Sequence, residues 1–81
     1  WNDEELKALS ARVVRAAPND KVANLMRAVV LGGWCAERGS AAELVEAATH
    51  YERAAALSDA PAVKADYASF AAGCRSGAEA M

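Results

Sequence analysis

The chain of 81 residues has few of the residue types that point to a specific chemistry. Two cysteines are too few for a disulfide framework, and one histidine offers no pair of ligands at metal-binding spacing. A net charge of −2, with no run of basic residues, argues against sequence-independent binding of nucleic acid, which needs a concentrated basic face. No apolar run approaches the roughly 20 residues that a membrane-spanning helix needs. These absences argue against disulfide-stapled, nucleic-acid-binding and membrane-spanning classes.

What the chain does have is alanine at helical spacing. No segment alternates between apolar and polar residues with a period of two, and no hairpin turn signal appears, so strands are not expected. Hydrophobic residues make up 54% of the chain, but alanine inflates this figure and aromatic residues contribute only 6%. The sequence therefore predicts an all-α fold with a thin core of closely spaced helices.

The organisation of the chain predicts one helical domain over residues 1–81. Because the chain begins with Trp1 rather than methionine, we expect it to be a piece of a longer protein. Cys35 and Cys74 both fall within apolar helical patterns, which indicates two buried thiols in an intracellular, cytoplasmic setting. A single bridge between the two cysteines is the alternative, and it would imply an oxidising compartment.

The first helix is expected from about Asp3 to Ala17. Asn2 is a good N-cap, Glu5 lies at the capping-box position, and Trp1 can fold onto Leu6 as a hydrophobic staple. Pro18, with the two polar residues after it, ends this helix and begins the next. The stripe predicted to be buried consists of Leu6, Leu9, Val13 and Ala16.

The second helix is expected to start near Lys21 and to lie at the centre, because its middle has almost no polar face. Gly32 and Gly33 leave its end open, since each glycine costs about 1 kcal/mol in a helix interior relative to alanine. One alternative ends the helix at Leu31. The favoured alternative continues it to about Arg38, with glycines that let a neighbouring helix come close.

The third and fourth helices have the clearest boundaries. Ser40 and Glu43 form a capping box for a helix that should end near Leu57 or Ser58. Pro61 suits the first turn of a fourth helix, which Gly77 is expected to end. Their predicted inner faces are Leu44, Ala47, Ala48, Tyr51, Ala54 and Ala55 in the third helix, and Val63, Tyr67, Phe70, Ala71 and Cys74 in the fourth. Short connections make the four helices antiparallel neighbours, arranged as two hairpins.

The third and fourth helices resemble part of a tetratricopeptide repeat (TPR). Ala47, Tyr51, Ala54 and the later Pro61 match the order alanine, aromatic, alanine, proline that this family uses. The unit from Lys21 to Pro61 is longer than the family period of about 34 residues by about two helical turns. Two added turns return the side chains to nearly the same face of the helix, so the packing of a lengthened hairpin can be kept. In a second register, Leu31, Trp34 and Cys35 occupy the family's large, large and small positions. The resemblance covers about half the chain and implies a TPR-like right-handed stack of hairpins, with a small bundle as the alternative.

The resemblance implies a scaffold that mediates protein–protein interaction and binds a peptide or a partner helix, without catalysis. The family's best-defined site grips a terminal carboxylate with Lys, Asn and Arg side chains, and Lys21, Asn24 and Arg27 are the nearest candidates here. From the helix geometry alone, Asn24, Arg27, Leu31 and Trp34 lie on one continuous stripe. That stripe can form a groove with Trp34 as the apolar anchor, or Leu31 and Trp34 can belong to the core while the polar pair is solvated.

Other residue types give weaker functional signals. His50 is expected on the outer, solvent-facing side of the third helix, four residues after Glu46. Cys35 sits late in its helix, which disfavours a reactive thiolate, and Gly32–Gly33 lacks the flanking pattern of a phosphate loop. We therefore expect no enzyme activity, no cofactor and no metal. The alternative function is a structural or assembly subunit that completes a larger chain or a homo-oligomer, because repeat units rarely stand alone.

Overall fold

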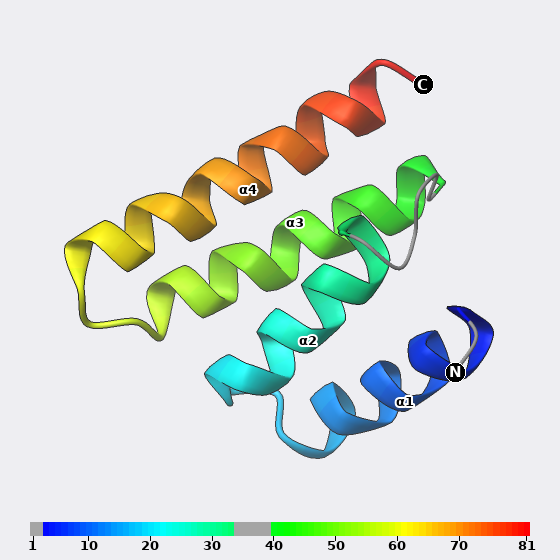
Figure 1. The fold of residues 1–81 in the computed structure, drawn as a ribbon, viewed down its shortest axis with the longest axis horizontal. Helices are drawn as coiled ribbons and strands as arrows, with labels where there is room; N and C mark the ends of the chain where they lie inside the picture. Colours follow the sequence, from blue (N-terminus) through cyan, green and yellow to red (C-terminus); the bar gives the residue numbers. More distant parts are fainter. Residues whose placement is uncertain (1–2, 34–39) are drawn as a thin grey trace.

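The computed structural model describes residues 3–33 and 40–81, and these residues form an all-α fold. In chain order the four helices are α1 (Asp3–Ala16), α2 (Lys21–Gly32), α3 (Ala41–Ala56) and α4 (Pro61–Glu79). Successive helices run antiparallel, and α3 and α4 lie side by side along most of their length (Figure 1). No strand occurs in the described ranges. The all-α class and the antiparallel order predicted from the sequence are confirmed.

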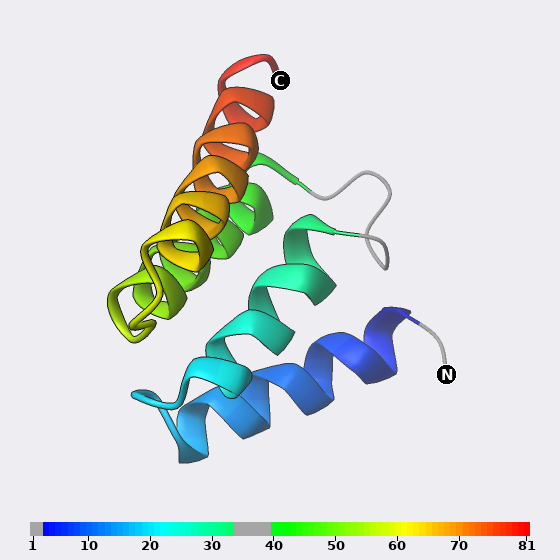
Figure 2. The ribbon, with the colours of Figure 1, turned by 60° about the vertical axis from the view of Figure 1, so that its left-hand side comes forward.

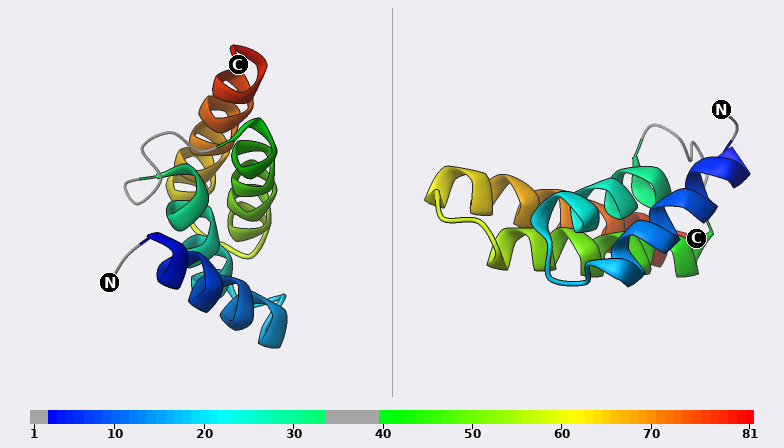
Figure 3. Two further views of the ribbon diagram at one scale, coloured as in Figure 1. Left: turned by 90° about the vertical axis from the view of Figure 1, so that its right-hand side faces the viewer. Right: turned by 90° about the horizontal axis from the view of Figure 1, so that it is seen from below.

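The helices pack in a row that follows the chain. The main contacts are α1 with α2, α2 with α3, and α3 with α4. Figure 2 shows α2 between α1 and the α3–α4 pair, and the left view of Figure 3 shows the same order. The Cα atoms extend over 32 × 31 × 17 Å, so the molecule is flat. A flat row leaves the outer sides of its terminal helices, α1 and α4, without a neighbour among the described residues.

Local signals explain where the helices begin. The Ser40 Oγ accepts a hydrogen bond from the Glu43 amide at 3.1 Å, and the Ser40 amide donates to Glu43 Oε1 at 3.0 Å, which is the predicted capping box. Asp20 caps α2 by accepting from the Ala23 amide at 2.9 Å. Pro61 occupies the first turn of α4, as predicted. Asn2 and Trp1, the proposed cap and staple of α1, lie outside the described residues.

Two predicted helix ends are wrong. Helix α2 ends at Gly32, and Gly33 leaves the helical conformation with φ −113° and ψ −135°, so the favoured continuation toward Arg38 fails at this point. Residues 34–39 lie outside the described residues. Helix α4 passes through Gly77 and ends at Glu79, because nothing at Gly77 turns the backbone into a left-handed conformation.

The core lies where α2, α3 and α4 meet. Tyr51 is 8% exposed and Leu31 is 1% exposed, and these are the largest apolar side chains in it. Alanines fill the remaining space and let the helix backbones approach closely. The core cluster consists of Ala28, Leu31, Ala47, Ala48, Tyr51, Ala71 and Cys74. The inner face predicted for the third helix is thus confirmed at Ala47, Ala48, Tyr51 and Ala54.

In α1 the predicted stripe is only partly correct. Leu6, Leu9 and Val13 are half-buried and Ala16 is exposed, whereas Ser10 is completely buried. The buried serine is satisfied locally, because its Oγ donates to the Lys7 carbonyl oxygen at 3.0 Å. Helix α1 therefore contacts α2 through a polar residue as well as through its apolar side chains.

Candidate interaction site

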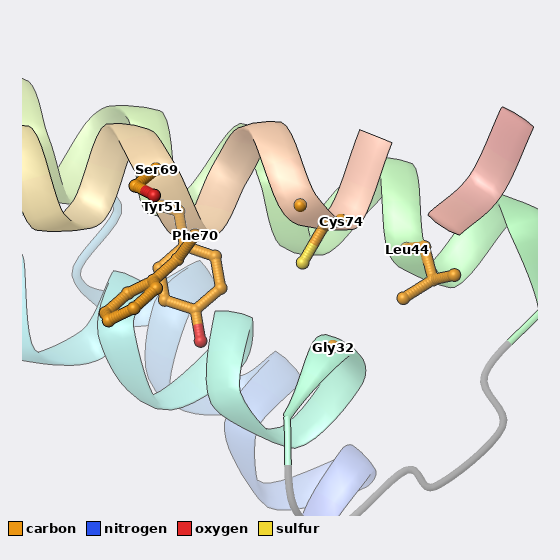
Figure 4. A pocket seen from close by; sticks show the side chains of 7 residues that line it. Gly32, Leu44, Tyr51, Ser69, Phe70 and Cys74 are labelled. Atoms are coloured by element: carbon orange, nitrogen blue, oxygen red, sulfur yellow. The ribbon is translucent and has the colours of Figure 1, made fainter. Parts of the chain in front are cut away.

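An apolar hollow lies between the C-terminal end of α2 and the facing sides of α3 and α4 (Figure 4). Its volume is about 310 Å³, which is enough for a large side chain. The residues that line it are Gly32, Leu44, Tyr51, Ser69, Phe70, Gly73 and Cys74. We call this cavity the α2–α4 hollow.

Aromatic rings form one wall of the α2–α4 hollow. The Phe70 and Tyr51 ring centroids are 5.5 Å apart at an interplanar angle of 59°, and the Tyr67 ring centroid is 6.4 Å from that of Phe70. Tyr51 is buried, but 51% of Phe70 is exposed. Figure 4 shows both rings pointing from their helices toward α2. The half-exposed Phe70 ring therefore lies at the opening of the hollow.

Close helix contact forms the floor of the hollow. A Cβ atom at Gly32 would lie 2.8 Å from both the Ala47 Cβ and the Cys74 Sγ, so only glycine fits at this position. This confirms that glycine lets a neighbouring helix come close to α2. Cys74 is a free, buried cysteine, and burial raises the pKa of its thiol. The thiol therefore acts as an apolar wall rather than as a nucleophile.

The residues predicted to bind a partner do not share one surface. Asn24 is completely buried and Leu31 is a core residue, so neither is exposed to a partner. Lys21 is exposed at the start of α2, and Trp34 lies outside the described residues. Arg27 is half-buried and is engaged within the chain. The helical spacing of the stripe is correct, but α1 and α3 cover the part of it that the structure describes.

Arg27 instead joins three helices. Its Nη1 donates to the Lys7 carbonyl oxygen at 2.8 Å and to the Ser10 Oγ at 3.0 Å, both on α1. Its Nε donates to Glu46 Oε2 at 3.0 Å on α3. Burial raises the pKa of Glu46, but the hydrogen bond and the charge of Arg27 outweigh it and hold this pKa below its ordinary value. A second link between α1 and α3 is the ion pair of Lys7 with Glu43 at 2.8 Å.

The prediction that His50 faces solvent is wrong, because the residue is 7% exposed and packs against α2. Asn24 Nδ2 donates to the carbonyl oxygens of Pro18 and Asp20, both at 2.9 Å, which fixes the orientation of the amide. Asn24 Oδ1 therefore accepts from His50 Nδ1, at 2.8 Å. The i,i+4 contact with Glu46 was predicted correctly, with His50 Nε2 at 3.2 Å from Glu46 Oε2.

The charge state of His50 follows from these surroundings. Burial lowers the pKa of His50, and the adjacent Glu46 carboxylate opposes this effect without cancelling it. In the neutral ring the single proton lies on Nδ1 and is donated to Asn24, so Nε2 donates to Glu46 only when the ring is protonated. Asn24, Arg27, Glu46 and His50, with Ser10, form one buried polar network that sets how α1, α2 and α3 meet. We call it the polar network, and its members hold one another rather than a ligand.

None of the described residues that line the α2–α4 hollow is among the predicted partner-binding residues, and Phe70 and Gly73 are the two whose role the sequence reasoning came nearest to. Phe70 matched the apolar spacing of the fourth helix and was therefore assigned to the core. The available signal was Gly73, a glycine in the middle of an otherwise regular helical pattern. A glycine inside a helical pattern suggests a packing or functional role, but a Cβ atom at Gly73 would meet nothing within 4 Å.

Within the described ranges, no helix is long and apolar enough to cross a membrane, and no group of three or more acidic, histidine or cysteine residues is placed to hold a metal ion. No protein-family model matches the chain, and searches of curated proteins and of solved structures also give no match.

Proposed function

We propose that this domain is a protein-interaction module, and that the α2–α4 hollow receives a large apolar side chain from a partner helix or peptide. The observation that supports this most strongly is Phe70, which is 51% exposed beside an apolar cavity of about 310 Å³. A half-exposed ring next to an unfilled apolar cavity is energetically unfavourable in water. It becomes favourable when a partner side chain covers both.

The arrangement of helices supports a scaffold role. Helices that pack in chain order form extended surfaces, as helical repeats such as TPRs do. A module of this kind binds through shape and needs no cofactor. The buried, free thiol of Cys74 agrees with an intracellular, reducing location. We therefore keep the TPR-like scaffold, without catalysis, as the proposed class.

A peptide selection tests the proposal. A random peptide library should yield binders to the wild-type chain that share a large apolar residue, and Phe70→Ser should lose these binders. Ser69→Arg is a second variant, because it fills the mouth of the hollow without removing a core side chain. Val22→Ser is the matched control, since Val22 is 67% exposed on α2 and does not line the hollow.

Circular dichroism should show that all three variants remain helical. The proposal is wrong if the wild-type chain selects no peptides, or if Phe70→Ser and Ser69→Arg bind the selected peptides as well as Val22→Ser does.

A further inference from the structure

The Tyr51 hydroxyl is a polar group without a partner at the edge of the core. Among the described residues it makes no hydrogen bond, although Tyr51 as a whole is only 8% exposed. Every completely covered polar side-chain atom in the described ranges does have a partner. The Tyr51 hydroxyl therefore keeps a small accessible surface, and the α2–α4 hollow that this residue lines provides it. Because a buried phenol normally finds a hydrogen-bond partner, this hydroxyl needs an explanation.

The position and charge state of the Tyr51 hydroxyl make it a hydrogen-bond donor toward the hollow. Figure 4 shows its oxygen at the end of the ring that points from α3 toward α2. Burial raises the pKa of Tyr51, and the neighbouring Cys74 adds to this effect. The phenol therefore stays protonated in neutral solution, and its proton is available to an acceptor on another molecule.

The rest of the lining favours a neutral, aromatic occupant. None of the described residues that line the hollow carries a charge, so a charged group that entered would lose its water without gaining an ion-pair partner. The Phe70 ring is 51% exposed and already forms a tilted pair with Tyr51 at 5.5 Å. A third ring can extend this cluster, because aromatic rings pack well in tilted and offset arrangements.

We propose that the side chain entering the α2–α4 hollow is a tyrosine of the partner, whose ring packs against Phe70 and whose hydroxyl oxygen accepts a hydrogen bond from Tyr51. This inference rests on the proposed function and names the residue that the partner contributes. The hollow, of about 310 Å³, has room for such a ring. In the free chain, water that enters the hollow can bind the Tyr51 hydroxyl, and in the complex the partner's oxygen takes the place of that water.

Other large side chains satisfy the hollow less well. Phenylalanine or leucine would displace the water and leave the Tyr51 proton without an acceptor, which costs about tenfold in affinity. Tryptophan brings a ring but only a donor, and glutamine brings an acceptor without a ring. Histidine brings a ring that is readily charged. Tyrosine combines a neutral ring with an acceptor oxygen at its tip.

The peptides selected by the wild-type chain supply the ligands for the test. We expect the large apolar residue that they share to be tyrosine. Replacing that tyrosine with phenylalanine in the peptide should raise the dissociation constant about tenfold, because the Tyr51 hydroxyl is then covered without an acceptor. Isothermal titration calorimetry of both peptides against the 81-residue chain measures the difference.

Tyr51→Phe completes a double-mutant cycle with the peptide substitution. The variant should bind the tyrosine peptide about tenfold more weakly than the wild-type chain does, and it should bind the phenylalanine peptide at least as tightly. Tyr67→Phe is the matched control, because the Tyr67 ring also neighbours Phe70 but is not among the residues that line the hollow. Tyr51→Phe should also keep the thermal midpoint, since the lost hydroxyl bonds to nothing in the described chain.

The outcomes separate this inference from the proposed function. The inference is overturned if the wild-type chain binds the tyrosine and phenylalanine peptides equally, if Tyr51→Phe and Tyr67→Phe have the same effect on binding, or if Tyr51→Phe lowers the thermal midpoint. Peptides that bind through Phe70 without a preference for tyrosine would refute the inference and leave the interaction role standing. A chain that selects no peptides would refute both.

Discussion

Replacing Asn24 with alanine should lower the free energy of unfolding by about 2–3 kcal/mol. The amide is completely buried and makes three hydrogen bonds, to the carbonyl oxygens of Pro18 and Asp20 and with His50 Nδ1. The Asp20 carbonyl keeps a partner in the variant, because it also accepts from the backbone amide of residue 24 at 3.1 Å. The Pro18 carbonyl belongs to an exposed turn, where water can replace the lost donor.

The uncompensated loss is therefore at the His50 ring, whose buried Nδ1 keeps no hydrogen-bond partner. Such a group costs about 1–3 kcal/mol, and the space vacated by the amide adds to it. A chain of this length has a total stability of roughly 4–12 kcal/mol, so the variant should lose a large fraction of it. Urea unfolding followed by circular dichroism measures the difference.

Asn19→Ala is the control, because Asn19 is exposed in the same turn. A double-mutant cycle with His50→Ala isolates the contact between the two side chains, and we expect a coupling of about 1 kcal/mol or more. If Asn24→Ala proves no more destabilising than Asn19→Ala, then the polar network does not hold the helices together and our reasoning about it fails.

Three further predictions follow from the described contacts. Gly32→Ala should destabilise the fold by about 1–3 kcal/mol in urea, because its methyl group would overlap α3 and α4, and an unchanged midpoint would contradict this close contact. Ser40→Ala should cost about 1 kcal/mol through loss of the capping box with Glu43, while Ser40→Gly should cost only a few tenths of that. Burial lowers the pKa of His50, so the unfolded chain binds a proton more readily than the folded chain, and the free energy of unfolding should fall as the pH drops below the ordinary pKa of 6.5. The pKa of Glu46 is also lowered in the folded chain, so a further loss of stability should follow below pH 4.5. His50→Gln should flatten the upper part of this profile, and an identical slope in the variant would refute the assignment.

The boundaries that the sequence predicts well are those set by neighbouring residues. Ser40 with Glu43 begins α3, and Pro61 begins α4, because capping and the fixed φ angle of proline act over one turn of chain. The inner face of α3 was also predictable, since Tyr51 stands alone among alanines. These features need no knowledge of which helix lies where.

Features that depend on a second neighbour were not predictable. The sequence reasoning placed His50 in solvent because the alanine face of α3 was taken as its only packed face. In the structure α3 packs against both α2 and α4, so a second face is buried. Asn24 and Ser10 are polar residues that become buried because partners beyond their own helix surround them. Phe70 has core spacing but lies where the row of helices stops. In each case the missing information was the arrangement of helices in space.

The row of helices has a consequence for how the molecule opens. Where each helix mainly contacts the next one along the chain, the total stability is approximately the sum of the contributions of the helices and of the interfaces between neighbours. The terminal helices can therefore detach separately. Helix α1 is held through α2, the Arg27 bonds and the Lys7–Glu43 pair, whereas α3 and α4 share the alanine core. Amide protons of α1 should therefore exchange with deuterium sooner than those in the middle of α3. We expect α1 to unfold locally before the other helices do.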